Sequence, residues 1–309
     1  MKTTRRQIIA GAAGAALFAP AIAATRAQAQ ASWRAQFPVL NVAVIPAENQ
    51  QTVMSRYAAL QAYLARTFGV EVRLFTATDY AGIIEAQRAR RVEMAFHGPA
   101  SYARAFEVTQ GNVEPIVIET DINGVALYRS VIVVRADNAA KSIEDLRGKT
   151  LAFVDPNSMS GFVAPNFFLS KAGTPANTYF SRTGFAGSHD NVALAVVNGQ
   201  YDAGFVWFRS ASDSVFQRMW DKNLIPKDSV RVVWTSPDIP ESPWVVRKDL
   251  PQAMRDDLRK AMLDMVNVDP EGFKQITAGN SKGFVPGSHA VYEPVLEMIR
   301  FNQTQRRGS

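Results

Sequence analysis

Two serines and a glycine follow a short apolar run in a stretch that has the chemistry of an anion-binding turn. Residues 151–154 are apolar, as in a buried strand, and turn residues end the run. Ser158 or Ser160 can cap the helix that is predicted to follow. Free N–H groups, the helix dipole and the hydroxyls favour an anion there, and Gly161 lets a ligand approach the backbone closely. The alternative is an ordinary capped helix that binds nothing.

Two histidines lie at predicted junctions between strands and helices. His97 follows the predicted strand 92–96, and His189 precedes a predicted helix. A structural role is the alternative for each of them. The chain has three histidines and no cysteine. We therefore expect no thiol catalysis and no metal site.

Residues 1–29 have the composition of an export signal. Lys2, Arg5 and Arg6 precede an apolar, alanine-rich run that is too short to span a membrane. Residues 4–9 resemble a twin-arginine leader, and a general secretory signal is the alternative. The mature protein is therefore expected outside the cytoplasmic membrane.

The leader also accounts for much of the net charge. The full chain carries 34 basic and 28 acidic residues, a net charge of +6. Residues 1–29 contain four basic residues and no acidic one, which leaves 30 basic against 28 acidic residues, a net charge of +2. Such a balance argues only weakly for nucleic acid, and we expect no such partner.

Strands and helices alternate along the mature chain. Apolar runs at 39–45, 70–75, 92–96 and 113–119 are separated by helical periodicity, and the alternation restarts near residue 150. This order predicts mainly parallel sheets with helices on both faces and a ligand beyond the carboxyl ends of the strands.

Two connecting segments suggest that the chain forms two lobes. We expect residues 36–126 and 240–309 to form one lobe and residues 127–239 to form the other. The long strand near residues 128–135 and the segment 234–243, which contains three prolines, would join the lobes. Two such crossovers allow the lobes to close like a hinge over a ligand.

Several blocks of sequence resemble the phosphonate-binding periplasmic proteins of ABC importers, from about residue 38 to residue 300. The blocks include 79–84, 128–130, 155–161 and 187–190. The resemblance implies an α/β type II periplasmic-binding-protein fold that closes on a phosphonate, phosphite or related oxyanion. It also implies a periplasmic, non-enzymatic and monomeric protein without a cofactor, which delivers its ligand to a membrane permease and ATPase.

The same resemblance implies a set of ligand contacts. Tyr80, His97 and Tyr128 match contacting positions, although His97 stands where the family has Tyr, and His189 matches a donor to the oxyanion. The four residues 158–161 match the phosphonyl cradle: Ser158, Met159, Ser160 and Gly161. Met159 replaces a hydroxylated residue, so that only its N–H can serve.

Two departures from the family bear on specificity. Aminoalkylphosphonate binders place a Glu downstream of the matching His and an Asp in the proline-rich crossover, and both hold the ammonium group. By an ungapped count these positions are Arg209 and Ser242 here. A cation facing an ammonium group is repulsive, which disfavours an aminoalkylphosphonate, whereas Arg209 would suit a second acidic group. A solvated surface charge is the alternative for Arg209.

Two other functions stay open at the level of sequence. One is an enzyme on the same scaffold, although neither paired carboxylates nor a Ser-His-Asp arrangement supports it. The other is a ligand sensor that acts with a membrane receptor through the same cleft. Genes for a permease and an ATPase beside this one would favour transport over sensing.

Overall fold

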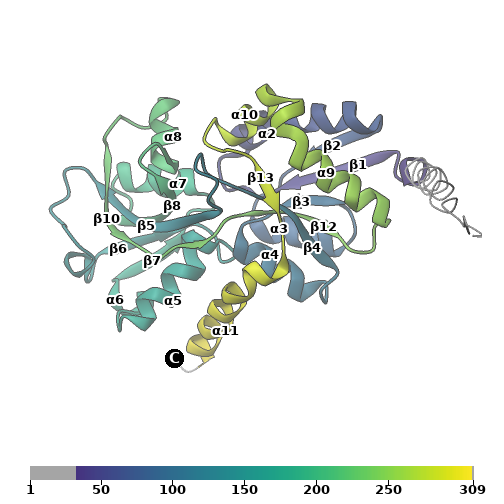
Figure 1. Cartoon of the computed structure of the whole chain (residues 1–309). Coiled ribbons are helices and arrows are strands. Elements are labelled where there is room, and N and C mark those ends of the chain that lie inside the picture. The colour runs from purple at the N-terminus through teal and green to yellow at the C-terminus, as the bar shows by residue number, and fades with distance from the viewer. Residues whose placement is uncertain (1–32, 308–309) are drawn as a thin grey trace, which may run out of the picture.

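The computed structural model describes residues 33–307, which form two α/β lobes side by side (Figure 1). The predicted export signal lies outside the described residues. In the described part, no helix is long and apolar enough to cross a membrane.

The sheet of the first lobe has the strand order β13-β4-β12-β3-β1-β2. Its strands are β1 (Val39–Val44), β2 (Glu71–Phe75), β3 (Met94–Phe96), β4 (Val113–Glu119), β12 (Pro243–Arg247) and β13 (Phe284–Pro286). β1 is parallel to β2 and β3, whereas β12 is antiparallel to β3 and β4, and β13 is antiparallel to β4. The sheet is therefore mixed rather than mainly parallel, because the returning strand β12 inserts between β3 and β4.

The sheet of the second lobe has the order β10-β5-β8-β6-β7 and the same kind of mixed pairing. Its strands are β5 (Leu127–Arg135), β6 (Thr150–Phe153), β7 (Arg182–Phe185), β8 (Ala203–Ser210) and β10 (Val230–Thr235), with β9 (Asp213–Ser214) paired to β8. β6 is parallel to β7 and β8, and β5 is antiparallel to β8 and β10. β7 begins only at Arg182, because Tyr179 ends a short helix.

Helices cover both faces of each sheet (Figure 1). The first lobe has α2 (Gln50–Phe68), α3 (Tyr80–Arg88), α4 (Pro99–Val108), α9 (Gln252–Val268) and α10 (Pro270–Thr277). The second lobe has α5 (Ala164–Lys171), α6 (Ala176–Tyr179), α7 (His189–Val197) and α8 (Val215–Asp221). Single turns lie at η1 (Glu144–Leu146), η2 (Met159–Val163) and η3 (His289–Tyr292), and α11 (Glu293–Arg307) ends the chain.

α2 illustrates how the sequence determines these helices. The Asn49 side chain accepts a hydrogen bond from the N–H of Thr52, and Gly69 ends the helix in the left-handed conformation. The buried face repeats every three or four residues: Val53, Tyr57, Leu60, Leu64 and Phe68. That face packs in a core with Trp33 and Trp244, so the first lobe is held together by apolar burial.

The chain passes between the lobes after β4 and again after β10. The two connecting segments pair with each other over two residues. In the second connection, β11 (Ile239–Pro240) is antiparallel to Leu127 and Tyr128, which begin β5 at the end of the first connection. The C-terminal helix α11 also touches both lobes, since it packs on α4 and α5. The Asn302 amide donates to the carbonyl of Val163 at 2.8 Å. α11 is thus not confined to the first lobe, to which the sequence assigned it.

Candidate functional site

A cavity of about 100 Å³ lies between the lobes, beyond the carboxyl ends of β1, β4, β6 and β8. Eight of the ten predicted ligand contacts line it: Tyr80, Tyr128, Ser158, Met159, Ser160, His189, Arg209 and Ser242. His97 and Gly161 are not among the lining residues. The structure thus brings together residues that lie up to 162 positions apart in the sequence.

The serine-rich turn leads into a widened helical turn rather than directly into an α-helix. Ser158 caps it, and its hydroxyl oxygen accepts a hydrogen bond from the N–H of Gly161 at 3.1 Å. The N–H of Val163 reaches back five residues to the carbonyl of Ser158 at 2.9 Å, which is the hydrogen bond of a π-helix. The α-helix α5 begins at Ala164, with Pro165 in its first turn. Ser158 and Ser160 are thereby held, buried, at the cavity wall.

Gly161 has a different role from the one predicted. An added Cβ atom would lie 2.4 Å from the Cβ of Val154, which follows β6. The N–H of Val154 also donates to the Gly161 carbonyl at 3.2 Å. Gly161 is therefore required for the π turn to pack against the end of β6, and not for the approach of a ligand to its own backbone.

His189 begins α7 and presents one ring nitrogen to the cavity. Its Nδ1 atom accepts a hydrogen bond from the backbone N–H of Trp207 at 3.3 Å, and Nε2 lies 3.5 Å from the Ser158 hydroxyl oxygen. Burial lowers the pKa of His189 to about 3, so the ring is neutral at physiological pH. Because Nδ1 accepts, the proton is on Nε2, and His189 is an uncharged donor toward the cavity.

Tyr80 and Tyr128 supply two further hydroxyl groups. Burial raises the pKa of Tyr80, which has the Ser158 hydroxyl as a hydrogen-bonding neighbour. Burial also raises the pKa of Tyr128, which has Ser160 as its neighbour. Both phenols therefore remain protonated, and each of them faces one serine of the cradle.

His97 is wholly buried away from the cavity. Its Nε2 atom lies 3.0 Å from the Gln87 side-chain oxygen, and Nδ1 lies 3.3 Å from the Ser101 hydroxyl. Its neighbours Phe96 and Gly98 line the cavity instead. Since successive side chains of an extended chain point to opposite sides, a residue between two cavity-lining positions points away from the ligand. The structure therefore does not bring His97 to the cavity with the other predicted contacts, and its internal hydrogen bonds fit the structural alternative.

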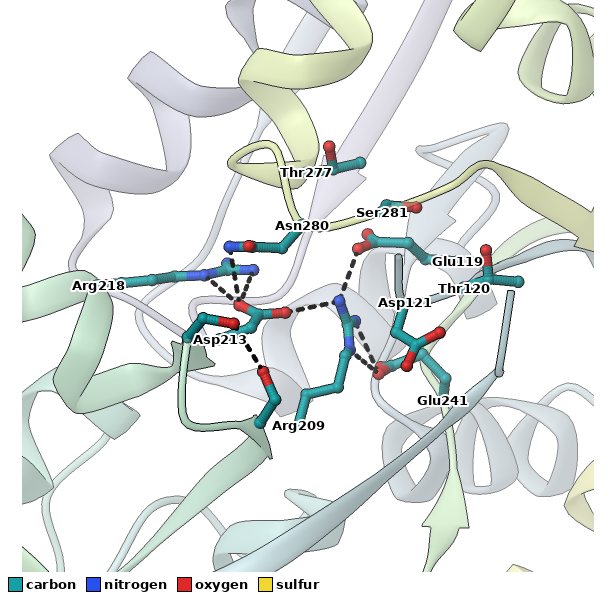
Figure 2. Close-up of polar contacts among 12 residues, drawn as sticks. Glu119, Thr120, Asp121, Arg209, Asp213, Arg218, Glu241, Thr277, Asn280 and Ser281 are labelled. Atoms are coloured by element: carbon teal, nitrogen blue, oxygen red, sulfur yellow. Dashed lines mark hydrogen bonds and ion pairs between the residues drawn. The ribbon is translucent and has the colours of Figure 1, made fainter. Parts of the chain in front are cut away.

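Arg209 is surrounded by carboxylates from three segments (Figure 2). Its guanidinium lies 3.1 Å from Glu119, 2.8 Å from Asp213 and 2.8 Å from Glu241. The side chain is 9% exposed. Arg209 is therefore not a solvated surface charge, and four of its five N–H donors already serve carboxylates, which leaves little to bind a second acidic group of a ligand.

Two carboxylates of this group were missed by the sequence analysis. Glu119 ends β4, and Glu241 immediately precedes the Ser242 position that the ungapped count selected. Ser242 donates its backbone N–H to the Glu241 carboxylate at 2.7 Å. The crossover thus presents a carboxylate at the cavity after all, one residue from the predicted position. The sequence did contain a signal for Glu241, because an acidic residue lies there between two prolines of the crossover.

The two other arginines that line the cavity are also paired with carboxylates. Arg56 forms an ion pair with Glu48. Arg218 lies 2.8 Å from Asp213 and 3.7 Å from Glu48. Among the residues that the structure describes, no group of His, Asp and Glu side chains has the arrangement of a metal site. Each of the three arginines that line the cavity therefore already has a carboxylate as its ion-pair partner.

Two α/β lobes of this strand order, with a cavity lined by hydrogen-bond donors at their junction, define a type II periplasmic binding protein. The chain matches, over residues 42–292, the family model described as "ABC transporter, phosphonate, periplasmic substrate-binding protein". It therefore belongs to the phosphonate-type substrate-binding proteins of ABC transporters, which are transport components and not enzymes.

Relatives and solved structures agree with this membership. The chain is 33% identical over 276 residues to the phosphate-import protein PhnD of Mycolicibacterium smegmatis, with 84% of each covered. It is 31% identical over 256 residues to the phosphonates-binding periplasmic protein of Escherichia coli, with 81% of this chain and 72% of that protein covered. The structure of PhnD1 from Prochlorococcus marinus with methylphosphonate matches at a TM-score of 0.72 and 27% identity, over 85% of this chain and 98% of that chain.

Proposed function

We propose that this chain captures a small phosphorus oxyanion, such as a phosphonate, phosphite or phosphate, in the cavity between its lobes. It then delivers the ligand to the permease and ATPase of an importer. The observation that carries the proposal is the convergence of uncharged donors on one cavity: the hydroxyls of Tyr80, Tyr128, Ser158 and Ser160 and the Nε2–H of His189. Hydrogen bonds to a charged group contribute about 1.5–3 kcal/mol each, so such a set can hold an oxyanion without a counter-cation.

The size of the cavity supports a compact ligand. Sites for drug-sized molecules have volumes of roughly 300 Å³ or more. The cavity here has about 100 Å³, which suits a tetrahedral headgroup with a short substituent. The relatives are named for phosphate import, for phosphonates and for phosphite, and one related structure holds methylphosphonate. These relatives support a phosphorus oxyanion as the ligand of this chain, but they do not distinguish between phosphate, phosphite and a phosphonate.

The location and assembly of the protein are part of the same proposal. Residues 1–29 would direct export to the periplasm, with the twin-arginine route favoured by residues 4–9. The mature protein would act as a monomer that closes about the β4–β5 and β10–β12 crossovers. Sedimentation of the mature chain, with and without ligand, tests the monomer.

Isothermal calorimetry tests the function. The mature chain, freed of carried-over ligand by unfolding and refolding, is titrated with phosphite, methylphosphonate and phosphate, and with acetate as the control anion. At least one phosphorus oxyanion should bind at least a hundredfold more tightly than acetate, because acetate has fewer oxygens for the converging donors. Equal binding of acetate, or no binding of any phosphorus oxyanion by refolded protein, would overturn the proposal.

A further inference from the structure

We propose that Arg209 is the resident cation of the cavity and that it determines the substrate class, namely compact phosphorus oxyanions that carry no cationic group. The guanidinium forms ion pairs with the carboxylates that would otherwise bind a cationic group of a ligand. This inference rests on the proposed function and narrows it. Arg209 acts through the carboxylates beside it, and thus positions and neutralises them rather than binding the ligand itself.

The ion pairs of Arg209 cross the cleft between the lobes. Arg209 lies on β8 of the second lobe, whereas Glu119 ends β4 of the first lobe and Glu241 lies in the returning crossover (Figure 2). Both pairs are nearly buried, with side-chain exposures of 9% for Arg209, 13% for Glu119 and 8% for Glu241. Closing the lobes therefore brings carboxylates of the first lobe onto a cation of the second.

Glu119 and Glu241 depend on Arg209 for their ion pairs. Asp213 also pairs with Arg218, but Glu119 and Glu241 have no other ion pair among residues 33–307. Burial raises the pKa of Glu119, and the charge of Arg209 opposes that shift. A buried carboxylate that loses its only ion-pair partner is strongly unfavourable, so removal of Arg209 leaves two carboxylates without a contacting cation, and both would attract one.

The group formed by Arg209, Glu119 and Glu241 lines the same cavity as the oxyanion cradle. Tyr128 connects the two, because Ser160 is its hydrogen-bonding neighbour while the charges of Glu241 and Arg209 both act on its phenol. All four residues line the same cavity. A substituent that extends from the cradle past Tyr128 therefore meets carboxylates that already have a cation. An ammonium group gains no partner there, and an anionic group meets carboxylates.

The test compares methylphosphonate with 2-aminoethylphosphonate, which share a headgroup, by calorimetry on four proteins. Wild type should bind methylphosphonate at least tenfold more tightly than the amino compound. Arg209→Ala should bind methylphosphonate at least tenfold more weakly than wild type, and it should reverse the preference because the ligand ammonium replaces the guanidinium. Arg209→Lys should keep the wild-type preference. Arg73→Ala removes an exposed ion pair with Glu71 within the first lobe and is the matched control.

A charge-neutral variant keeps the test decisive if Arg209→Ala does not fold. Arg209→Ala combined with Glu119→Gln and Glu241→Gln lacks both the cation and the carboxylates that it serves. This variant should show no preference for the amino compound, and it should bind methylphosphonate at least fivefold more tightly than Arg209→Ala wherever the latter folds. Tighter binding of 2-aminoethylphosphonate than of methylphosphonate, either by the charge-neutral variant or by wild type, would overturn this inference but not the proposed function. Failure of wild type to bind either ligand would overturn the proposed function, and the inference with it.

Discussion

Two sets of residues that line the interlobe cavity differ in how they use charge. The cradle set presents uncharged donors, namely the two serines of the π turn, two tyrosines and the neutral ring of His189. The charged set consists of Arg56, Arg209 and Arg218, each of which is paired with a carboxylate. The cations of the cavity thus have partners within the protein, whereas the uncharged donors face the space in which an anion is expected to bind.

This difference shows how a protein can recognise an anion without a free cation. In a buried site a fixed N–H or O–H dipole acts at low effective dielectric and keeps its orientation when the ligand arrives. A guanidinium that already has carboxylate partners attracts a further anion only weakly, because the carboxylates cancel its field. The charged set instead joins the lobes, since Arg209 and Arg218 of the second lobe pair with Glu119 and Glu48 of the first.

The largest expected effect is the loss of both hydroxyls of the cradle. Ser158→Ala combined with Ser160→Ala should weaken binding by more than tenfold, since each lost hydrogen bond to a charged group is worth about 1.5–3 kcal/mol. Calorimetry measures the change. Ser188→Ala is the control, because Ser188 caps α7 as Ser158 caps its own turn but does not line the cavity. Equal losses in the two proteins would mean that helix capping, and not contact with the ligand, causes the effect.

A second prediction concerns Asp190, a carboxylate near Glu48, which is the partner of Arg56 and Arg218. Asp190 of α7 accepts hydrogen bonds from the Asn49 backbone N–H at 3.1 Å and from its side-chain amide at 3.3 Å. Burial raises the pKa of Asp190 from 3.8 to about 6, with the charge of Glu48 as the next cause. A raised pKa means that the folded state holds the proton more tightly than the unfolded state, so ionised Asp190 lowers stability above pH 6. This cost is relieved as the pH falls from 6 toward 4.

Asp190→Asn should therefore raise the free energy of unfolding at pH 7.5 by up to about 3 kcal/mol, at 1.36 kcal/mol for each pKa unit. The gain should shrink as the pH approaches 4. Thermal melting at pH 7.5 and pH 4.5 measures it, with the exposed Asp137→Asn as the control. A variant that is less stable than wild type by the same amount at both pH values would show that the ionised carboxylate stabilises the fold.

The third prediction separates the two buried histidines. His189→Gln should weaken binding about tenfold, because one donor to a charged group is displaced. His97→Gln should lower the melting temperature and leave affinity within about twofold, because both ring nitrogens serve internal contacts. Burial lowers the pKa of His189 to about 3, so the ratio of wild-type to His189→Gln affinity should be constant from pH 5 to pH 8. A ratio that grows toward pH 5 would indicate a protonated His189.

The smallest expected effect is that of salt. Increasing sodium chloride from about 50 to about 500 mM should change the dissociation constant of methylphosphonate by less than about threefold, because screening acts mainly on exposed charges. Calorimetry in both buffers checks this expectation. A weakening of tenfold or more would mean that an unpaired cation attracts the ligand.

Much of the fold could be predicted from the alternation of short apolar runs and amphipathic helices. The hydroxyls and glycine after residue 154 also indicated a helix terminus that faces a ligand, and the structure places Ser158, Ser160 and His189 at one cavity. The mixed pairing of the sheets was not predicted. No local sequence pattern shows that β12, the strand that returns after the crossover, runs antiparallel to its neighbours β3 and β4.

The errors in the site have physical reasons. The environment of Arg209 depends on Glu119, which is 90 residues away, and on Glu241, which is 32 residues away, and no local pattern encodes such pairs. His97 has the right residue type at the right end of a strand. A shift of one position along extended backbone nevertheless turns its side chain away from the cavity. The need for Gly161 arises from packing on Val154, which becomes visible only once the π turn is known.

The central claim is that uncharged donors hold the oxyanion, and a crystal structure of the mature chain with methylphosphonate tests it most directly. We predict that the phosphonyl oxygens lie within hydrogen-bonding distance of the hydroxyls of Ser158 and Ser160 and of Nε2 of His189. Arg209 should keep its contacts with Glu119 and Glu241. A phosphonyl group bound to the guanidinium of Arg56, Arg209 or Arg218, or a ligand outside this cavity, would contradict the account.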